Sequence, residues 1–506
     1  MPRLAPWLLA LGLVLLPSAT PLRAEDPPAA PGNKPAGPDA PPDDGADGPM
    51  PFGEEVNKAI EEGVAWLKAK PRIYTFRDEP AAHWGLVKGE RIYGGGDGPQ
   101  YRHPAGPTAL ALYTLLKCGV DPKDPVITEG FHWLKVVHPI TEETDGQEAP
   151  QFSWHHTQAA GAYEMSVMVL ALTAKYDAYK RTKNSADAAK AGKLKITNKD
   201  DLEWLQAMVQ GLVERRGTPS GEGSEPDKGW RYNVPVLTLS SGNSNWTRNS
   251  GRGHGGNQDL SSTQLAALAL YNAHRFGVKV EPEIWWDILA FALAQQEDDG
   301  PEHARHDPAY VAGGYAPPKD KARGFCYMKG SADGSEGKAT GSMTACGLGT
   351  ILICKEVICE TDKGRKRFLD KKMDTVVDKA TWDALAWLDK NWSAFENKYS
   401  TYGYPIYYLY SLERAMDILG KNLVGKNLWY QLGARQLLDK DKPVEVDERQ
   451  KKGTRKVPGT HWMTNSTHEP KDVLDTCFAL LFLKRATKGL IPRAVTGGDE
   501  GPRDNR

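Results

Sequence analysis

The sequence predicts an all-α fold, an (α/α)6 toroid in which six inner helices are surrounded by six outer helices. One observation is a repeat, because the segment ALALY occurs at 109–113 and again at 267–271. A second is that two kinds of helical segment alternate along the chain. A third is that the links after outer segments are long and those after inner segments are mostly short. Together these features favour one closed ring over an open α-solenoid, because closure gives every helix pair a neighbour that buries its second side.

The two ends of the chain differ from the rest in composition. Residues 1–24 contain a basic start and the apolar run LAPWLLALGLVLL, which is too short to span a bilayer and is typical of a secretory signal. Residues 25–52 are mostly Pro, Ala, Gly and Asp, and we expect them to be disordered, like 491–506. We therefore expect an exported protein, secreted or periplasmic, with one folded domain over 53–490.

The first kind of segment is rich in leucine and small residues. Its apolar residues recur at the spacing of an α-helix, and apolar or small residues also fill most of the other positions. A helix of this composition is buried on all sides, so we expect these segments to form the inner ring. The six segments are 106–120, 161–176, 259–278, 341–357, 403–419 and 472–486.

The second kind of segment is amphipathic and carries a tryptophan near its middle. The polar face favours an outer position, with the tryptophan and the leucines packed inward. The six segments are 54–70 with Trp66, 127–137 with Trp133, 199–216 with Trp204, 283–296 with Trp286, 379–392 with Trp387 and 427–438 with Trp429.

The long links run from outer to inner segments, and ten of the twelve histidines lie in them. In an alternating ring all of these links meet at one face, where the inner helices begin. Long loops on a rigid scaffold are where functional residues are usually found. We therefore expect a ligand site at that face; the links are 71–105, 137–160, 216–258, 297–340 and 440–471.

Several short motifs accompany the alternation. Two outer segments share the pattern GxxWL, at 63–67 and 130–134. Gly-aromatic turns, such as KGWRY at 228–232, precede inner segments. The inner segments themselves, such as DTCFALLFLKRA at 475–486, form the third motif. In these motifs the chain resembles the terpenoid cyclase and protein prenyltransferase superfamily, and most of all the squalene-cyclase-like bacterial proteins with prenyltransferase/squalene oxidase repeats. The resemblance covers about 54–490 and implies a toroid whose central cavity binds an apolar or extended ligand.

The catalytic motifs of that superfamily match this chain less well. Squalene-hopene cyclases use a D-x-D-D acid motif, whereas the nearest string here, QEDDG at 296–300, ends an outer segment. Prenyltransferases hold zinc with Asp, Cys and His, for which Asp475, Cys477 and His103 are a weak counterpart, since the family's His comes later in the chain. The plainer alternative makes Asp475 an N-cap and Cys477 a core residue. We expect no resident cofactor, with zinc at these three residues as the alternative.

Three carboxylates begin inner segments: Glu164, Asp259 and Asp475. Helix N-termini favour negative charge, and Asp259 is suited to an N-cap that accepts hydrogen bonds from amides near Ser261 and Ser262. The alternative is general acid–base catalysis, for which paired carboxylates are the usual tool. An enzyme of that kind would be an isoprenoid cyclase with displaced acid residues, or a carbohydrate lyase or hydrolase.

Aromatic and histidine side chains of the long links are the candidates for ligand contact, because such groups around a concave mouth make a binding site. The alternative is that these aromatic side chains plug the ring. The candidates are Trp154, His156, Trp230, His254, Tyr402 and Trp462.

Two further features bear on partners and metals. The net charge of −1 gives no reason to expect a nucleic-acid partner, and we predict no transmembrane helix after the leader. His303 and His306 form an HxxH pair that gives a minor alternative of metal binding. We expect Cys346 and Cys354 to be buried core residues.

Overall fold

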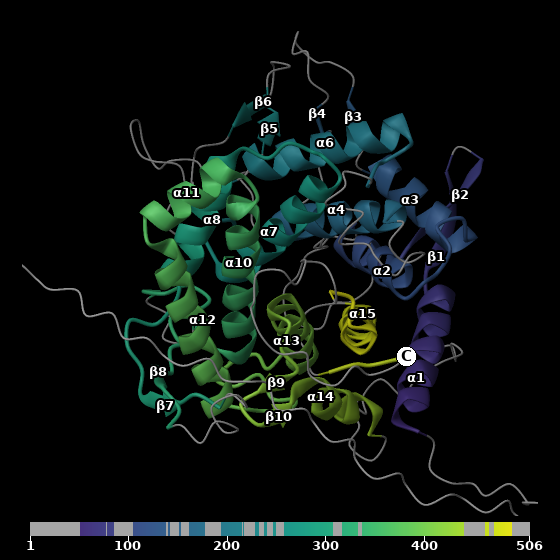
Figure 1. Ribbon diagram of the computed structural model, residues 1–506. Helices are drawn as coiled ribbons and strands as arrows, with labels where there is room; N and C mark the ends of the chain where they lie inside the picture. The colour runs from purple at the N-terminus through teal and green to yellow at the C-terminus, as the bar shows by residue number, and fades with distance from the viewer. Residues whose placement is uncertain are drawn as a thin grey trace, which may run out of the picture. The chain divides into compact units, whose positions relative to one another are not determined.

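The computed structural model describes much of the chain between Pro51 and Thr487 (Figure 1). The predicted signal sequence, the Pro-rich segment as far as residue 50 and the tail after residue 490 lie outside the described residues. The described residues belong to one compact unit, Pro51–Arg506. They are 51–76, 78–85, 105–137, 140–141, 151–152, 161–177, 194–214, 216, 228–231, 237–239, 246–248, 258–306, 316–331, 336–439, 461–464 and 470–487.

The prediction of an all-α fold is confirmed, since the described residues form thirteen helices and only five short antiparallel hairpins. Each of the six leucine- and alanine-rich segments forms a helix that is buried on nearly every face. In one of them, every residue from Leu260 to Ala273 is buried. The six helices are α2 (Ala105–Lys117), α4 (Ala162–Tyr176), α7 (Leu260–Arg275), α10 (Gly341–Cys359), α13 (Pro405–Leu419) and α15 (Lys471–Lys484).

The six amphipathic segments also form helices, but their tryptophans are not all placed as predicted. Four of the six predicted tryptophans are buried, whereas Trp133 is partly buried. In the segment 283–296 the buried residue is Trp285, and Trp286 instead packs against Phe368 of the short helix α11 (Asp362–Asp370), which the sequence pattern did not predict. The helices are α1 (Phe52–Ala69), α3 (Pro125–Val137), α6 (Lys199–Glu214), α8 (Pro282–Ala294), α12 (Met373–Lys390) and α14 (Trp429–Leu438).

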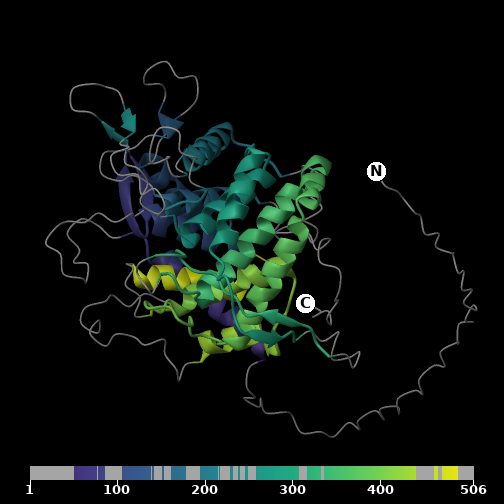
Figure 2. The ribbon, with the colours of Figure 1, turned by 90° about the vertical axis from the view of Figure 1, so that its left-hand side faces the viewer.

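The buried helices contact one another in chain order. Helix α2 packs against α4, α4 against α7, α7 against α10, α10 against α13, and α13 against α15. Helix α15 in turn packs against α2, so the succession of contacts begins and ends on the same helix. The amphipathic helices each contact one or two of these buried helices, as α8 does with α7 and α10. Figure 2 shows α10 and α12 running side by side.

The first and last helices of the unit meet directly. Helix α1, purple in Figure 1, lies beside α15, drawn in yellow, and the two pack together. Just beyond α1, the ammonium of Lys70 donates a hydrogen bond to the carboxylate of Asp472 in α15. A Cβ on Gly63 would lie 2.8 Å from Cδ2 of Leu480, so only glycine allows this close approach of the helix backbone.

The second GxxWL motif uses its glycine in the same way. A Cβ on Gly130 of α3 would lie 2.7 Å from Cδ2 of Leu112 in α2. A methyl group there would overlap a side chain that has no free space of its own, because Leu112 is fully buried. The glycine of the motif therefore sets the distance between an amphipathic helix and the buried helix beneath it.

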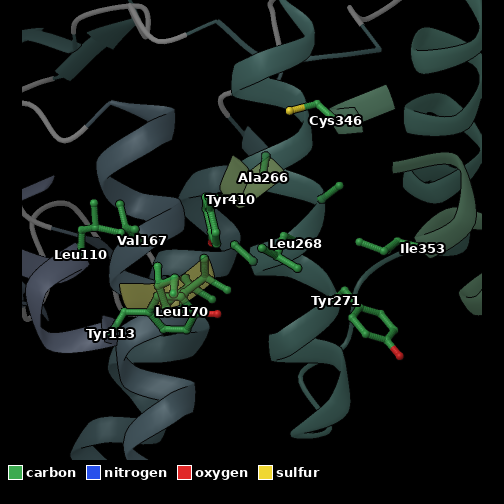
Figure 3. Close-up of a cluster of buried hydrophobic side chains, with 14 of the residues drawn as sticks. Leu110, Tyr113, Val167, Leu170, Ala266, Leu268, Tyr271, Cys346, Ile353 and Tyr410 are labelled. Carbon is green, nitrogen blue, oxygen red and sulfur yellow. The ribbon is translucent and has the colours of Figure 1, made fainter. Parts of the chain in front are cut away.

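Side chains from five buried helices contribute to a single apolar core. Figure 3 shows Leu110 of α2, Val167 of α4, Leu268 of α7, Ile353 of α10 and Tyr410 of α13 in this cluster. Burying a side chain of this size contributes about 1.5–3 kcal/mol, so packing between these helices is a major source of stability. Cys346 and Cys354 of α10 are buried in the same core, as predicted.

Short hairpins interrupt the links between helices. Four of them follow an amphipathic helix and precede a buried helix, and the fifth lies between α13 and α14. The sequence pattern predicted no strands there, because two- to five-residue strands are too short to show an alternating pattern. They pair β1 (Arg72–Phe76) with β2 (Glu79–His83), β3 (Ile140–Thr141) with β4 (Gln151–Phe152), β5 (Leu237–Leu239) with β6 (Trp246–Arg248), β7 (Glu302–Ala304) with β8 (Lys319–Lys321), and β9 (Leu423–Val424) with β10 (Asn427–Leu428).

One described helix, α10, is long and apolar enough to cross a membrane by length and composition. The prediction of no transmembrane helix after the leader is consistent with this finding, because a single such helix that is mostly buried is weak evidence for a membrane span. Most of α10 is buried against protein, and it packs against α7, α8, α12 and α13. Its apolar residues therefore mostly face neighbouring helices.

Candidate functional site

Two of the predicted ligand-binding tryptophans belong to a repeated structural motif. The indole N–H of Trp230 donates to the carbonyl of Leu212 near the end of α6 at 2.7 Å, and its backbone N–H donates to Oγ1 of Thr263 in α7 at 2.9 Å. Trp462 repeats both bonds, with Leu437 of α14 at 3.1 Å and Thr476 of α15 at 3.0 Å. Each tryptophan thus joins the end of an amphipathic helix to the start of the next buried helix.

The same motif occurs, in full or in part, at two further links. Trp84 donates to the carbonyl of Leu67 in α1 at 2.8 Å and to Oγ1 of Thr108 in α2 at 3.1 Å. Phe325, which lacks an indole N–H, keeps only the backbone bond, to Oγ1 of Thr344 in α10 at 3.1 Å. The indole groups of this motif are buried and already bonded to the protein, so their evident role is structural.

Asp259 is the N-cap of α7, as its sequence context predicted. Its carboxylate accepts hydrogen bonds from the backbone N–H of Ser262 at 2.6 Å and from Oγ of Ser262 at 2.9 Å, and Nη1 of Arg231 lies 3.9 Å away. The side chain is fully buried, and this burial raises the pKa of Asp259 to about 6 despite those contacts. It is therefore a carboxyl group that ionises close to neutrality.

Glu164 and Asp475 are buried but bonded in different ways. Glu164, in the first turn of α4, accepts from the backbone N–H of Gly161 at 2.9 Å and from that of Gly106, in α2, at 3.3 Å. Asp475 lies in the second turn of α15, whose N-cap is Pro470, so the N-cap interpretation of Asp475 was wrong. It accepts instead from the N–H and the hydroxyl of Thr464, both at 2.7 Å, and burial raises its pKa.

The remaining sequence-predicted residues fall into two groups. Tyr402 is 59% exposed and stacks at an angle on Tyr404. Cys477 is fully buried, and burial raises the pKa of its thiol, whose hydrogen-bond partner is Thr114 of α2, whereas Asp475 bonds to Thr464. The others, His103, Trp154, His156 and His254, lie outside the described residues.

A polar stripe along α13 is the most distinctive feature between the buried helices, and we call it the α13 stripe. It consists of Tyr407, Ser411 and Arg414, whose spacing of four and three residues places them on one face of the helix. Sγ of Cys346 in α10 lies 3.6 Å from the hydroxyl of Tyr407 and 3.5 Å from Oγ of Ser411. The stripe therefore faces the neighbouring helix α10.

The Tyr407 end of the α13 stripe is connected by hydrogen bonds to two further helices, α7 and α4. The hydroxyl of Tyr407 lies 3.0 Å from Oγ of Ser261 and accepts from Nε2 of Gln264 at 3.3 Å, both in α7. Ser261 is bonded in turn to the hydroxyl of Tyr163 in α4. One hydrogen-bond network therefore connects α4, α7, α10 and α13 at a point surrounded by buried helices.

Arg414 ends this stripe and is incompletely bonded. Its side chain is buried, with 4% of its surface exposed, and Nη2 donates to Oγ of Ser411 at 3.3 Å. Tyr410 is a second hydrogen-bond partner of the guanidinium. The guanidinium carbon lies 4.1 Å from the centre of the Tyr410 ring. Nε and Nη1 are buried and donate no hydrogen bond within the described part of the chain.

The two carboxylates nearest to Arg414 in sequence, Glu413 and Asp417, are bonded to other residues. Glu413 accepts from the N–H and the hydroxyl of Thr487, at 2.8 and 3.0 Å. Asp417 is bonded through both oxygens to the guanidinium of Arg485. Because a guanidinium keeps its charge at every physiological pH, Arg414 is a buried cation with free donors.

The other groups of the network are neutral near pH 7. Burial raises the pKa of the Cys346 thiol and of the Tyr407 phenol, so neither ionises there. The network thus presents hydroxyl and thiol dipoles around one fixed positive charge. Such an arrangement can bind an anion, but it contains no activated nucleophile.

No protein-family model matches the chain, and no curated protein matches it.

The sequence analysis missed the α13 stripe, although its signal is present in the sequence. The segment GYPIYYLYSLERAMDIL was interpreted as a buried helix, yet it contains serine, glutamate and arginine. Charged residues are seldom fully buried unless they are paired, so a charge within a helix expected to be buried is itself an indication of a site. The partners of the stripe's hydroxyl groups come from α7 and α10, and Glu413 is bonded to Thr487 just beyond α15, so no local pattern predicts them.

Proposed function

We propose that this chain is a ligand-binding protein whose six buried helices form the inner ring of an (α/α)6 toroid. The closed succession of contacts from α2 through α15 and back to α2 supports this arrangement, and so does the position of the amphipathic helices outside it. The ligand is a small molecule with an anionic group and an apolar body, and it binds within the ring, in keeping with the squalene-cyclase-like resemblance.

The observation that carries this proposal is the buried, incompletely bonded guanidinium of Arg414. Each buried donor without an acceptor costs about 1–3 kcal/mol, so a protein retains such a group where something else supplies the acceptor. The planar guanidinium is well suited to carboxylate and phosphate oxygens. A carboxylate or phosphate group next to Ser411 and Cys346 would satisfy both the charge and the free donors.

The apolar body would lie against an aromatic cluster beside the stripe. Phe478 of α15 lies 5.4 Å from Tyr407 and 5.2 Å from Tyr410, measured between ring centres. Tyr163, Tyr407 and Phe478 are only partly buried although they belong to buried helices. Tyr163 and Tyr407 lie in the first turns of α4 and α13, and Phe478 lies in the middle of α15. The exposure of the two tyrosines supports entry of a ligand from the end where α4 and α13 begin.

The enzymatic alternative, a displaced-acid cyclase or a carbohydrate-active enzyme, depends on Asp259, Glu164 and Asp475. The buried Asp259, with its pKa of about 6, has the protonation behaviour of a general acid. Both of its oxygens, however, already hold the start of α7 through Ser262, so the binding function is the better supported of the two. We also propose, from the predicted signal sequence, that binding takes place after export.

The test is ligand binding by the full chain and by an arginine variant. Isothermal titration of the wild-type protein with dodecanoate, dodecyl phosphate and uncharged dodecanol compares three probes of similar apolar length. We expect the anionic probes to bind at least ~10-fold more tightly than dodecanol, because a hydrogen bond to a charged group contributes about 1.5–3 kcal/mol. In Arg414→Met that preference should disappear.

A matched control is Arg435→Met, because Arg435 is half-exposed and its partner is Glu55 on the surface. This variant should keep the preference for the anionic probes. Native mass spectrometry of the purified protein adds a second readout, in which an anionic small molecule accompanies the wild type and is absent from Arg414→Met. Equal binding of dodecanoate by the wild type and Arg414→Met, with nothing retained by either, would contradict the proposal.

A further inference from the structure

A second cluster of chemically active side chains lies away from the α13 stripe, where the β7–β8 hairpin packs against α12. His303 is the middle residue of β7, and His306 follows two residues after the strand. Asp389 is the penultimate residue of α12, more than eighty residues further along the chain. The fold therefore brings the distant Asp389 to the HxxH pair of His303 and His306.

The three side chains converge on one point. Nε2 of His303 lies 2.8 Å from Oδ2 of Asp389, and Nδ1 of His306 lies 2.5 Å from the same oxygen. The imidazole rings are 5.5 Å apart and nearly perpendicular. The donor atoms of all three residues lie within 4.8 Å of one another, the separation at which one cation can touch all of them.

The chemistry of this donor set is that of a transition-metal site. Imidazole nitrogen and carboxylate oxygen bind Zn²⁺ at about 2.0–2.2 Å, and two histidines with one carboxylate are a recurrent three-ligand set for zinc and for non-haem iron. Magnesium and calcium, by contrast, prefer oxygen ligands. All three side chains are only partly buried, so a bound metal would keep a coordination position open to solvent.

The surroundings fix the carboxylate in place. Asp389 Oδ1 lies directly against Gly425, in the turn between β9 and β10, where a Cβ would overlap it. Gly425 also has a φ of 59°, a conformation that favours glycine. The other carboxylate oxygen, Oδ2, is the one that faces both histidines.

The neighbouring cation does not occupy the site. Arg305, between the two histidines in sequence, donates from Nε and Nη2 to the two oxygens of Asp320 at 2.8 and 2.7 Å. Its guanidinium also lies 3.6 Å from the ring centre of Trp382. Because its charge is balanced by Asp320, Arg305 leaves Asp389 to the two histidines.

We propose that His303, His306 and Asp389 bind a divalent transition-metal cation, with Zn²⁺ the best match to this donor set. The metal joins the β7–β8 hairpin to the end of α12 and keeps one position for water or a small ligand. The simpler alternative is that Asp389 only accepts a hydrogen bond from each histidine, and the experiment distinguishes the two.

The experiment is titration of the metal-free full-length protein with Zn²⁺, and with Co²⁺ as a spectroscopic probe. We expect one tight equivalent of Zn²⁺ and a visible Co²⁺ absorption band typical of a four- or five-coordinate site with nitrogen ligands. The double variant His303→Gln/His306→Gln lacks two of the three ligands. It should bind Zn²⁺ at this site at least ~100-fold more weakly, because the loss of even a hydrogen-bond partner of a metal ligand lowers metal affinity by about 10–100-fold.

The matched control is His274→Gln. His274 also pairs with a carboxylate, Glu360 Oε2 at 2.7 Å, but among the described residues no third ligand completes a metal-binding group with this pair. This variant should bind Zn²⁺ like the wild type. A wild-type protein that binds no Zn²⁺ and gives no Co²⁺ band, or a double variant that binds Zn²⁺ as tightly as the wild type, would overturn the proposal. The Co²⁺ spectrum of the wild type decides the question even if the double variant does not fold.

Discussion

Replacing Arg414 by methionine should stabilise the ligand-free protein. The variant keeps most of the apolar volume of the side chain but removes a buried charge whose Nε and Nη1 donate no hydrogen bond within the described residues. A residue that is present for a ligand, and not for the fold, should cost stability when no ligand is bound. The sign of the change is therefore informative in itself.

The magnitude follows from the contacts of Arg414. Two buried donors without acceptors cost about 1–3 kcal/mol each. Against this, methionine loses the contact with the Tyr410 ring, which contributes about 0.5–2 kcal/mol, and the charged hydrogen bond to Ser411, which contributes about 1.5–3 kcal/mol. Because these contributions nearly cancel, the removal of the buried charge itself decides the sign. We expect the free energy of unfolding to rise by about 1–3 kcal/mol, in line with other replacements of buried charges by apolar residues.

Arg485→Met is the control with the opposite sign. Arg485 is bonded through two nitrogens to Asp417, whose side chain is almost fully buried. Removing one partner of a buried ion pair leaves an uncompensated charge and costs about 3–5 kcal/mol. The free energy of unfolding of both variants and the wild type is measured by urea denaturation, with circular dichroism as the signal. The protein is first stripped of bound small molecules.

One result would refute the reasoning about Arg414. If Arg414→Met and Arg485→Met both destabilise the stripped protein by several kcal/mol, the guanidinium of Arg414 has structural partners that satisfy it, and the argument for an anionic ligand fails.

Two further predictions test other parts of the structure. For Asp259, a pKa raised from 3.8 to about 6 means that the folded state binds the proton more tightly, so this residue's stabilising contribution is present below pH 4 and falls as the pH rises to 6. Asp259→Asn should remove about 2 kcal/mol of the stability difference between pH 4 and pH 6, measured by urea denaturation at these two pH values, and an unchanged difference would contradict the assignment. For the helix contacts, Gly130→Ala should lower the free energy of unfolding by about 1–3 kcal/mol, because the added Cβ overlaps Leu112. Gly349→Ala in α10 should raise the free energy of unfolding by up to about 1 kcal/mol, because a Cβ there would have no neighbour closer than 3.9 Å and alanine favours the helix. Thermal unfolding that shows the same shift for both glycine variants would rule out the packing explanation.

Much of the secondary structure was predictable because it depends on local pattern. Apolar residues on every face of 259–278 can be accommodated only in a helix that is buried all round, and α7 is such a helix. An N-cap is also local, so Asp259 could be assigned from the DLSS sequence alone. The two tryptophans at 285 and 286 were harder, because adjacent residues differ by 100° around a helix and only the position of the neighbouring helices decides which one is buried.

The candidate sites were less predictable, because their residues come from distant parts of the chain. The α13 stripe depends on Cys346 and Ser261, and the metal cluster on Asp389, which lies 83 residues from His306. Aspartate is a residue type that favours N-caps, but Asp475 lies in the second turn of its helix, because Pro470 is the N-cap of α15. Sequence spacing does not reveal such pairings when the intervening chain is a long link.

The amino-acid sequence by itself determined the six buried and the six amphipathic helices, although not the short helix α11, because amphipathic period and residue size act over a single turn or two. Only the tertiary structure decided that Arg414 is left with free donors while Arg485 is paired, and that two histidines meet an aspartate. Hydrogen bonds and ion pairs form within about 3 Å, and only the packing of whole helices sets distances that short between residues far apart in the chain.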